Sequence, residues 1–267
     1  MTPLADCPRA VLAAVAGVLT DIDDTLSTDG RLTADAYGAL QALKTAGLTV
    51  VPVTGRPAGW CDHIARFWPV DAVVGENGAF WMWHDRAVGR LRTRFVQDEA
   101  VRAEGRRRLA AIREQVLREV PGAGIASDQP YRVADLAIDF REDVAPLPAD
   151  AIARIVAIFA AHGAQAKVSS IHVNGWFGDY DKLTTSRLMM RELFDIDVAA
   201  ERERWIFVGD SPNDAPMFGY FPNAVGVANV RGFAARLDHR PRWLTAGRSG
   251  EGFIELAETL LAARSAR

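Results

Sequence analysis

Residues 15–25 read Val-Ala-Gly-Val-Leu-Thr-Asp-Ile-Asp-Asp-Thr, an apolar run that leads directly into three aspartates. We interpret residues 15–20 as a buried strand, because a short apolar run bounded by polar residues is typical of strands covered on both faces. The aspartates Asp21, Asp23 and Asp24 then follow the carboxyl end of this strand. In open parallel sheets, ligand sites form along that edge.

The chain that follows this stretch alternates between helix and strand patterns. Thr33 is placed as the N-cap of a helix over residues 34–46. Apolar runs at residues 48–53 and 72–74 predict two further buried strands, with a helix over residues 59–67 between them. This alternation predicts an α/β fold with a Rossmann-like parallel sheet.

The middle of the chain has a different pattern, in which strands pair locally and two helices are long. The segments are paired strands in residues 80–95, a charged helix over 98–120, a strand at 135–140, a helix over 150–162 and a strand at 166–173. We interpret them as an α+β unit inserted into the parallel-sheet fold.

The parallel pattern resumes towards the C-terminus, with helices over residues 183–194 and 252–264 and strands at 205–208 and 224–227. The predicted division is a core of residues 1–84 and 181–267 and an inserted α+β unit of residues 85–180. Short linkers near residues 84–88 and 176–181 are expected to let the inserted unit move over the core.

The amino-acid composition and net charge indicate which classes of binding partner are not expected. The 267 residues are 49% hydrophobic, and the net charge of −3 gives no electrostatic reason to expect a nucleic acid or an anionic membrane as partner. The basic run at residues 106–108 stands among glutamates and is interpreted as a solvated helix face. No uncharged apolar stretch has the length of a membrane span, and residues 10–20 lack the basic flank of a signal peptide. The two cysteines, Cys7 and Cys61, form no CxxC pair and fit a reducing compartment. Together with the missing membrane span and signal peptide, this leads us to expect a cytoplasmic protein.

Four polar clusters offer the groups that phosphoryl transfer needs, and three of them follow predicted strands. They are Asp21-Ile22-Asp23, Thr54-Gly55-Arg56, Lys182 at the start of a helix, and Gly-Asp-Ser-Pro-Asn-Asp at residues 209–214.

A phosphate monoester is doubly negative, so a carboxylate nucleophile needs cations that offset the repulsion. Asp21 and Asp210 could hold Mg²⁺, which prefers a few carboxylates together with water and substrate oxygens. Lys182 could screen the remaining charge, and Thr54 could donate a hydrogen bond to a phosphoryl oxygen. Asp23 could protonate the leaving oxygen.

At these residues the sequence resembles the haloacid dehalogenase-like (HAD) superfamily. The motif DxDx[TV] is matched by Asp21, Asp23 and Thr25, the strand-end Ser or Thr by Thr54, the motif lysine by Lys182, and GDxxND by residues 209–214. The finer resemblance is to the subclass IIB, or Cof-like, hydrolases, which include sugar-phosphate phosphatases. It is carried by residues 54–56, 76–79 and 224–229 and by the position of the insert, and it implies a HAD core with a cap domain that covers the site.

The resemblance implies a role for each motif residue. Asp21 is the nucleophile and a metal ligand, and Asp23 is the acid and base that also gives its backbone carbonyl to Mg²⁺. Asp210 binds the metal, and Asp214 supports it through water. Thr54 and Lys182 hold the phosphoryl group, whereas Asp24 has no expected catalytic role.

Further substrate contacts are assigned to residues of both units: Gly55, Arg56, Asn77 and Asn213 in the core, and His172 and Asn174 in the cap. His172 and Asn174 share one strand face shortly before Lys182, and such side chains suit a sugar pocket. The alternatives are a packed histidine for His172 and a simple turn before Pro57 for Arg56. Trp81 and Trp83 are expected in the hydrophobic core.

The sequence thus predicts a Mg²⁺-dependent phosphatase that hydrolyses a small phosphate ester, such as a sugar phosphate, through an aspartyl-phosphate. The expected partner is this small molecule, with no nucleic acid and no membrane. A phosphomannomutase-like phosphomutase is an alternative, which would need cap arginines that hold a bisphosphate. A non-catalytic phospholigand-binding protein is another, although the nucleophile, the acid and the metal ligands are all retained.

Overall fold

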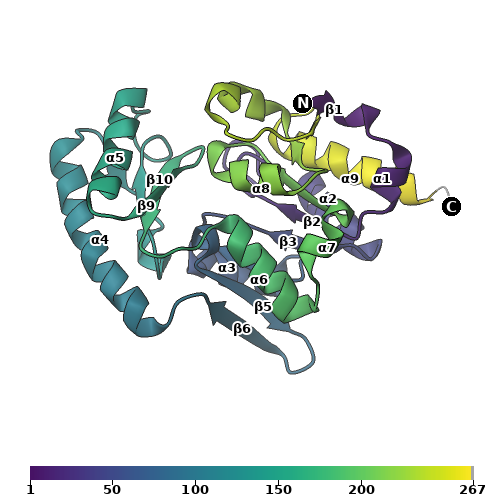
Figure 1. The fold of residues 1–267 in the computed structure, drawn as a ribbon, viewed down its shortest axis with the longest axis horizontal. Helices are drawn as coiled ribbons and strands as arrows, with labels where there is room; N and C mark the ends of the chain where they lie inside the picture. Colours follow the sequence, from purple (N-terminus) through teal and green to yellow (C-terminus); the bar gives the residue numbers. More distant parts are fainter. Residues whose placement is uncertain (266–267) are drawn as a thin grey trace.

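The aspartates of residues 21–24 follow a strand near one edge of a parallel sheet in the computed structural model, which describes residues 1–265 (Figure 1). This strand, β2 (Gly17–Thr20), lies between its parallel neighbours β11 and β3. The six strands have the order β1 (Thr2–Pro3), β13 (Trp243–Leu244), β12 (Val225–Gly226), β11 (Trp205–Gly209), β2 and β3 (Thr49–Pro52). All five neighbouring pairs are parallel. The three pairs among β2, β3, β11 and β12 join strands that the sequence predicts, whereas β1 and β13 are not among the predicted strands.

Helices cover both faces of this sheet. Val18 and Val50 face one hydrophobic cluster, whereas their neighbours Leu19 and Val51 face another, because successive side chains of a strand point to opposite faces. The first cluster includes residues of α1 (Arg9–Ala13), α2 (Ala34–Thr45), α3 (Ala58–Phe67) and α9 (Ser249–Ser265), and the second residues of α6 (Lys182–Phe194), α7 (Val198–Glu201) and α8 (Ala215–Tyr220). Short 3-10 helices are η1 (Leu4–Asp6), η2 (Glu76–Gly78), η3 (Gln129–Tyr131), η4 (Arg202–Arg204), η5 (Pro212–Asp214) and η6 (Ala228–Arg236).

A three-stranded antiparallel sheet extends the core. Its strands are β4 (Val73–Gly75), β5 (Phe80–Asp85) and β6 (Arg90–Phe95), and a parallel bridge between Val53 and Val74 joins it to the main sheet. The linker expected near residues 84–88 is wrong, because these residues end β5 and form the β5–β6 turn. Since β6 pairs with β5 along its whole length, we propose that the inserted unit begins after Phe95 rather than at residue 85.

The inserted unit, on the left of Figure 1, has its own sheet and hydrophobic core. Its antiparallel strands have the order β7 (Gly124–Ile125), β8 (Leu136–Asp139), β10 (His172–Trp176) and β9 (Gln165–Val168), and α4 (Glu99–Glu119) and α5 (Ala149–Ala161) pack against them. The single strand expected at residues 166–173 is therefore two strands, because the chain turns back at residues 169–171. We call this unit the cap below.

The predicted fold class, a parallel-sheet α/β core with an inserted α+β unit, is confirmed. The tryptophans Trp81 and Trp83 pack against the second hydrophobic cluster of the core, as expected. No helix within residues 1–265 combines the length and the apolar character that a membrane crossing requires.

Candidate active site at the carboxyl edge of the parallel sheet

Three buried carboxylates meet where β2 and β11 end. Asp21 follows β2, Asp210 follows β11, and Asp214 ends η5. The register pairs Thr20 with Val208, so the residues that follow both strands emerge side by side. One oxygen from each carboxylate lies within 4.8 Å of the others. The structure therefore brings together three of the four predicted metal ligands through their side chains.

Lys182 reaches this cluster from the first turn of α6. The helix begins with a capping box, in which the Asp181 carboxylate accepts a hydrogen bond from the Thr184 amide. The Lys182 ammonium lies 3.0 Å from Asp21 Oδ1 and 2.8 Å from Asp214 Oδ1. Burial lowers the pKa of Lys182, but the charges of Asp21 and Asp214 outweigh it and raise the pKa above its usual value. Lys182 thus stays positively charged inside the site.

The two remaining carboxylates of the cluster differ in how much of their hydrogen-bonding capacity is used. Asp214 Oδ2 accepts from the amides of Asp210 and Ser211, and its Oδ1 faces Lys182. Asp210 accepts from the Thr25 hydroxyl at 3.4 Å and the Asn229 amide at 3.0 Å, one to each oxygen. Asn229 has no predicted role in the site, although it ends the run 224–229 that carries part of the family resemblance.

The donor set of Asp21 and Asp210 fits a hard divalent cation such as Mg²⁺. Lys182 contacts one oxygen of Asp21, and Asp210 accepts one hydrogen bond on each oxygen, which leaves lone pairs on both residues. Asp214 accepts two hydrogen bonds on Oδ2 and contacts Lys182 through Oδ1, so it suits a supporting position. Burial and the charges of Asp214 and Asp23 raise the pKa of Asp21 to about 7, against the effect of Lys182. Burial and the same acidic neighbourhood raise the pKa of Asp210 well above its usual value. A bound cation would offset this repulsion.

The segment after β3 forms another wall of the site. The buried Thr54 hydroxyl accepts from the Arg56 amide at 3.0 Å, which leaves its proton available for a ligand. Gly55 lies close to Asn77 and Asn174, and an added Cβ would meet the Asn77 amide group at 3.2 Å. Asn77 is buried, and its Nδ2 has no hydrogen-bond partner among residues 1–265. These groups suit recognition of an anionic oxygen-rich ligand.

Glu76, next to Asn77, ties the cap to this wall although its sequence position gives no such indication. Its fully buried carboxylate accepts from the amide of Ala58 in the core. It also accepts from three consecutive cap amides, those of Val133, Ala134 and Asp135. The contact joins residues 57 or more positions apart in the chain, which is why local patterns do not reveal it.

The guanidinium of Arg56 contacts carboxylates of both the core and the cap. Its Nε lies 3.0 Å from both oxygens of Asp23, and its Nη2 lies 2.8 Å from Asp23 Oδ1 and 2.9 Å from Glu142 Oε1. Its Nη1 lies 3.4 Å from Asp128 Oδ2, and the guanidinium stacks over Trp60. Asp128 and Glu142 belong to the cap, so Arg56 connects the two units.

The predicted cap residues His172 and Asn174 lie on the same face of β10 and reach the core. His172 Nε2 lies 2.9 Å from Glu142 Oε2, and Asn174 donates to Asp135. Both border a small cavity. The centre of a water molecule can occupy about 10 Å³ of it, so the cavity has space for about one water. Its walls are formed by Asp21, Asp23, Gly55, Arg56, Arg132, Ser169, Ser170, Ile171, His172, Asn174 and Asn213.

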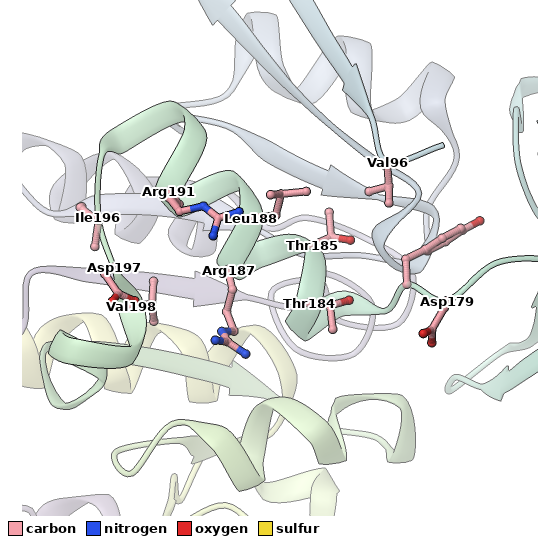
Figure 2. Close-up of a pocket in the computed structure, with 11 residues that line it drawn as sticks. Val96, Asp179, Thr184, Thr185, Arg187, Leu188, Arg191, Ile196, Asp197 and Val198 are labelled. Carbon is pink, nitrogen blue, oxygen red and sulfur yellow. The ribbon is translucent and has the colours of Figure 1, made fainter. Parts of the chain in front are cut away.

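A different hollow lies beside α6, between the start of that helix and α7 (Figure 2). Arg187 and Arg191 extend into it from α6, and Asp179 and Asp197 stand at its two ends. None of the predicted site residues lines it. The carboxylate cluster and the cap residues thus meet at the cavity above the sheet edge, not at this surface hollow.

Residues 18–99 match the family model of the haloacid dehalogenase-like hydrolases. Three similar solved structures cover nearly the whole chain. A HAD/COF-like hydrolase from Plasmodium vivax is 17% identical, with 95% of this chain and 99% of that chain covered and a TM-score of 0.67. The sucrose-phosphatase from Synechocystis sp. PCC6803, solved with sucrose and phosphate, is 14% identical (92% and 98% covered, TM-score 0.61). A HAD subclass IIB sugar phosphatase is 14% identical (93% and 100% covered, TM-score 0.61).

No curated protein sequence matches the chain. The match of residues 18–99 confirms the predicted resemblance to the haloacid dehalogenase-like hydrolases, and the solved structures share the fold of this chain.

Proposed function

We propose that this haloacid dehalogenase-like hydrolase is a Mg²⁺-dependent phosphatase that acts on the phosphate monoester of a sugar or a similar small metabolite. The observation that carries the proposal is the buried cluster of Asp21, Asp210 and Asp214 around Lys182 at the sheet edge. The names of two structural neighbours, a sucrose-phosphatase and a subclass IIB sugar phosphatase, support the substrate class.

In this proposal Asp21 is the nucleophile. Lys182 engages only one of its oxygens, so the other is available to attack phosphorus. The P–O bond to the leaving group breaks as the Asp21–phosphate bond forms, and Asp23 gives a proton to the leaving oxygen. Water then attacks the aspartyl-phosphate while Asp23 takes up a proton, which restores Asp21 and releases phosphate.

The remaining site residues hold the phosphoryl group. Lys182 and the Thr54 hydroxyl supply a positive charge and a hydrogen-bond donor. Asp21 and Asp210, with the Asp23 carbonyl, would hold Mg²⁺, which when bound supplies charge that offsets the phosphate dianion. The cavity beside Asp21 has space for about one water, and a hollow of about 250 Å³ adjoins it along Asp23, Arg56 and Glu142. An ester that enters this hollow therefore reaches Asp21 only when the cap moves away from the small cavity.

The pairing of Arg132, the cap arginine at the small cavity, favours the phosphatase over the phosphomutase, although a second cap arginine, Arg141, lines the adjoining hollow. Arg132 has no exposed side-chain surface and is paired with Asp128 and Asp135, which neutralise its charge. It is therefore poorly suited to bind the second phosphate of a bisphosphate. The cytoplasmic location stays a prediction.

Purified protein would be incubated with Mg²⁺ and a panel of glucose 1-phosphate, glucose 6-phosphate, fructose 6-phosphate, glycerol 2-phosphate and 4-nitrophenyl phosphate. We expect phosphate release by the wild type and none above background by Asp21→Asn, with EDTA abolishing the activity. Undiminished release by the variant would reject the nucleophile. Conversion of a sugar 1-phosphate into its 6-phosphate without phosphate release would indicate the mutase.

A further inference from the structure

We propose that Glu142 of the cap is a positioning residue that acts through Arg56 on Asp23, so that proton transfer to the leaving group depends on cap closure. The inference rests on the proposed phosphatase activity. Glu142 touches neither Asp21 nor Asp210 and reaches Asp23 through the Arg56 guanidinium, while its other oxygen contacts His172 at the same cavity.

The first link is the contact between Arg56 and Asp23. Arg56 Nε approaches both Asp23 oxygens at 3.0 Å, so the carboxylate is held from one side in a fixed plane. The Arg56 side chain is 5% exposed and stacks over Trp60 at 4.3 Å from the ring centre. An arginine packed in this way presents its donors in a rigid arrangement. Because Arg56 contacts Asp23 from one side, the remaining lone pairs of Asp23 are available on the side of the cavity that it borders. One of them can carry the proton that is transferred.

The second link is the contact between Arg56 and the cap. Arg56 Nη2 is shared between Asp23 Oδ1 at 2.8 Å and Glu142 Oε1 at 2.9 Å. This nitrogen lies between the core carboxylate and the cap carboxylate, so Glu142 is the cap group that helps to hold Arg56 in the orientation facing Asp23. The contact with Asp128, at 3.4 Å, is longer and involves a different nitrogen.

Glu142 is itself held in place within the cap. Its second oxygen lies 2.9 Å from His172 Nε2 on β10. Its backbone amide donates to Asp139 Oδ1 at 2.7 Å, and the amides of Arg141 and Asp143 also donate to the Asp139 carboxylate. The loop that carries Glu142 is thus fixed to β8, and Glu142 reaches Arg56 only when the whole cap is seated on the core.

The basicity of the leaving group predicts which esters react more slowly when the contact between Glu142 and Arg56 is lost. An alkyl leaving group departs as a strongly basic alkoxide and needs a proton from Asp23, whereas 4-nitrophenolate is a weak base and leaves without one. A misplaced Asp23 therefore slows formation of the aspartyl-phosphate from alkyl phosphates much more than its formation from 4-nitrophenyl phosphate. Loss of folded protein or of cap packing would slow both esters alike.

The test compares Glu142→Gln with Asp143→Asn, a control that removes the same charge from the neighbouring exposed position of the same loop. We expect Glu142→Gln to lower kcat/KM for the best alkyl phosphate of the panel by about tenfold, a part of the usual contribution of a general acid. This ratio covers only the steps up to departure of the leaving group, so it excludes the later hydrolysis of the aspartyl-phosphate, in which Asp23 serves as base for every ester. We expect less than about a twofold change with 4-nitrophenyl phosphate, and little change in either ester for Asp143→Asn.

A second measurement tests the path through Arg56. Arg56→Lys keeps the charge but cannot reproduce the two-nitrogen contact with Asp23. In that background Glu142→Gln should have almost no further effect on the alkyl phosphate, because contacting residues in one network are not additive. Equal losses with both esters, no loss with either, or full additivity with Arg56→Lys would overturn the role of Glu142. Failure of the wild type to hydrolyse any ester would instead reject the phosphatase.

Discussion

The buried carboxylate of Asp214 positions two parts of the site at once. It has no exposed side-chain surface, its Oδ1 lies 2.8 Å from the Lys182 ammonium, and its Oδ2 accepts from the amides of Asp210 and Ser211. The same carboxylate therefore places the lysine on one side and the backbone of a proposed metal ligand on the other. An amide of equal size cannot do both, because one of its two ends is a donor.

Asp214→Asn is expected to lower kcat/KM by about 100-fold, because losing a buried charge-assisted hydrogen bond costs roughly 2–3 kcal/mol. Asp24→Asn is the matched control: Asp24 has a φ of 56°, which asparagine tolerates, and its backbone carbonyl accepts from Asn229. It should keep nearly full activity. Steady-state kinetics with the best phosphate ester measure kcat/KM of both variants. A similar loss of kcat/KM in the two variants would contradict the distinct role of Asp214.

At the scale of elements, the carboxyl edge of the sheet was predictable and the contacts across the two units were not. The apolar runs of β2, β3 and β11 mark buried strands, and the polar residues after them come together because these strands are neighbours. The pairing of Arg56 with Glu142 joins residues 86 positions apart, and no local pattern encodes it. The helix α1 and the edge strand β1 were missed, since five- and two-residue elements carry little periodicity.

Gly78 controls the junction between η2 and α6. It has a φ of +111°, and an added Cβ would lie 2.3 Å from the carbonyl oxygen of Asp181, the N-cap residue before Lys182. Thr185 also donates to the Gly78 carbonyl. Gly78→Ala should therefore displace the start of α6, destabilise the protein by about 2 kcal/mol or more and reduce activity.

The matched control is Gly89→Ala in the β5–β6 turn, where φ is +64° and an added Cβ meets nothing within 4 Å. It should cost about 1 kcal/mol of stability and leave activity unchanged. Urea unfolding and the phosphatase assay report the two effects separately. Full activity in Gly78→Ala would show that Lys182 does not depend on this junction.

At the scale of the whole molecule, ion pairs of Arg56 with Asp128 and Glu142 connect the core to the cap. His172 and Arg56 lower the pKa of Glu142 to about 2, although its partial burial acts in the opposite direction. The ionised Glu142 is thus favoured in the folded state. Its contribution to stability is fully present above the usual pKa of 4.5 and is lost as the pH falls towards 2.

The free energy of unfolding should therefore differ between wild type and Glu142→Gln by an amount that depends on pH. We expect the difference to shrink by about 1–2 kcal/mol between pH 6 and pH 3, after allowance for the partial exposure of Glu142. Urea unfolding of both proteins at the two pH values measures it. A difference that stays constant would show that folding does not lower the pKa of Glu142.

The order of the strands in the main sheet has a consequence for biosynthesis. As the chain leaves the ribosome, β2 and β3 emerge early, but β11, which lies beside β2, is made only after the entire cap. The cap is one continuous segment and can fold while it is being made, whereas the nascent core has an unpaired edge at β2 until β11 arrives. Asp21 is therefore synthesised long before Asp210 can join it, and catalytic competence is acquired near the end of translation.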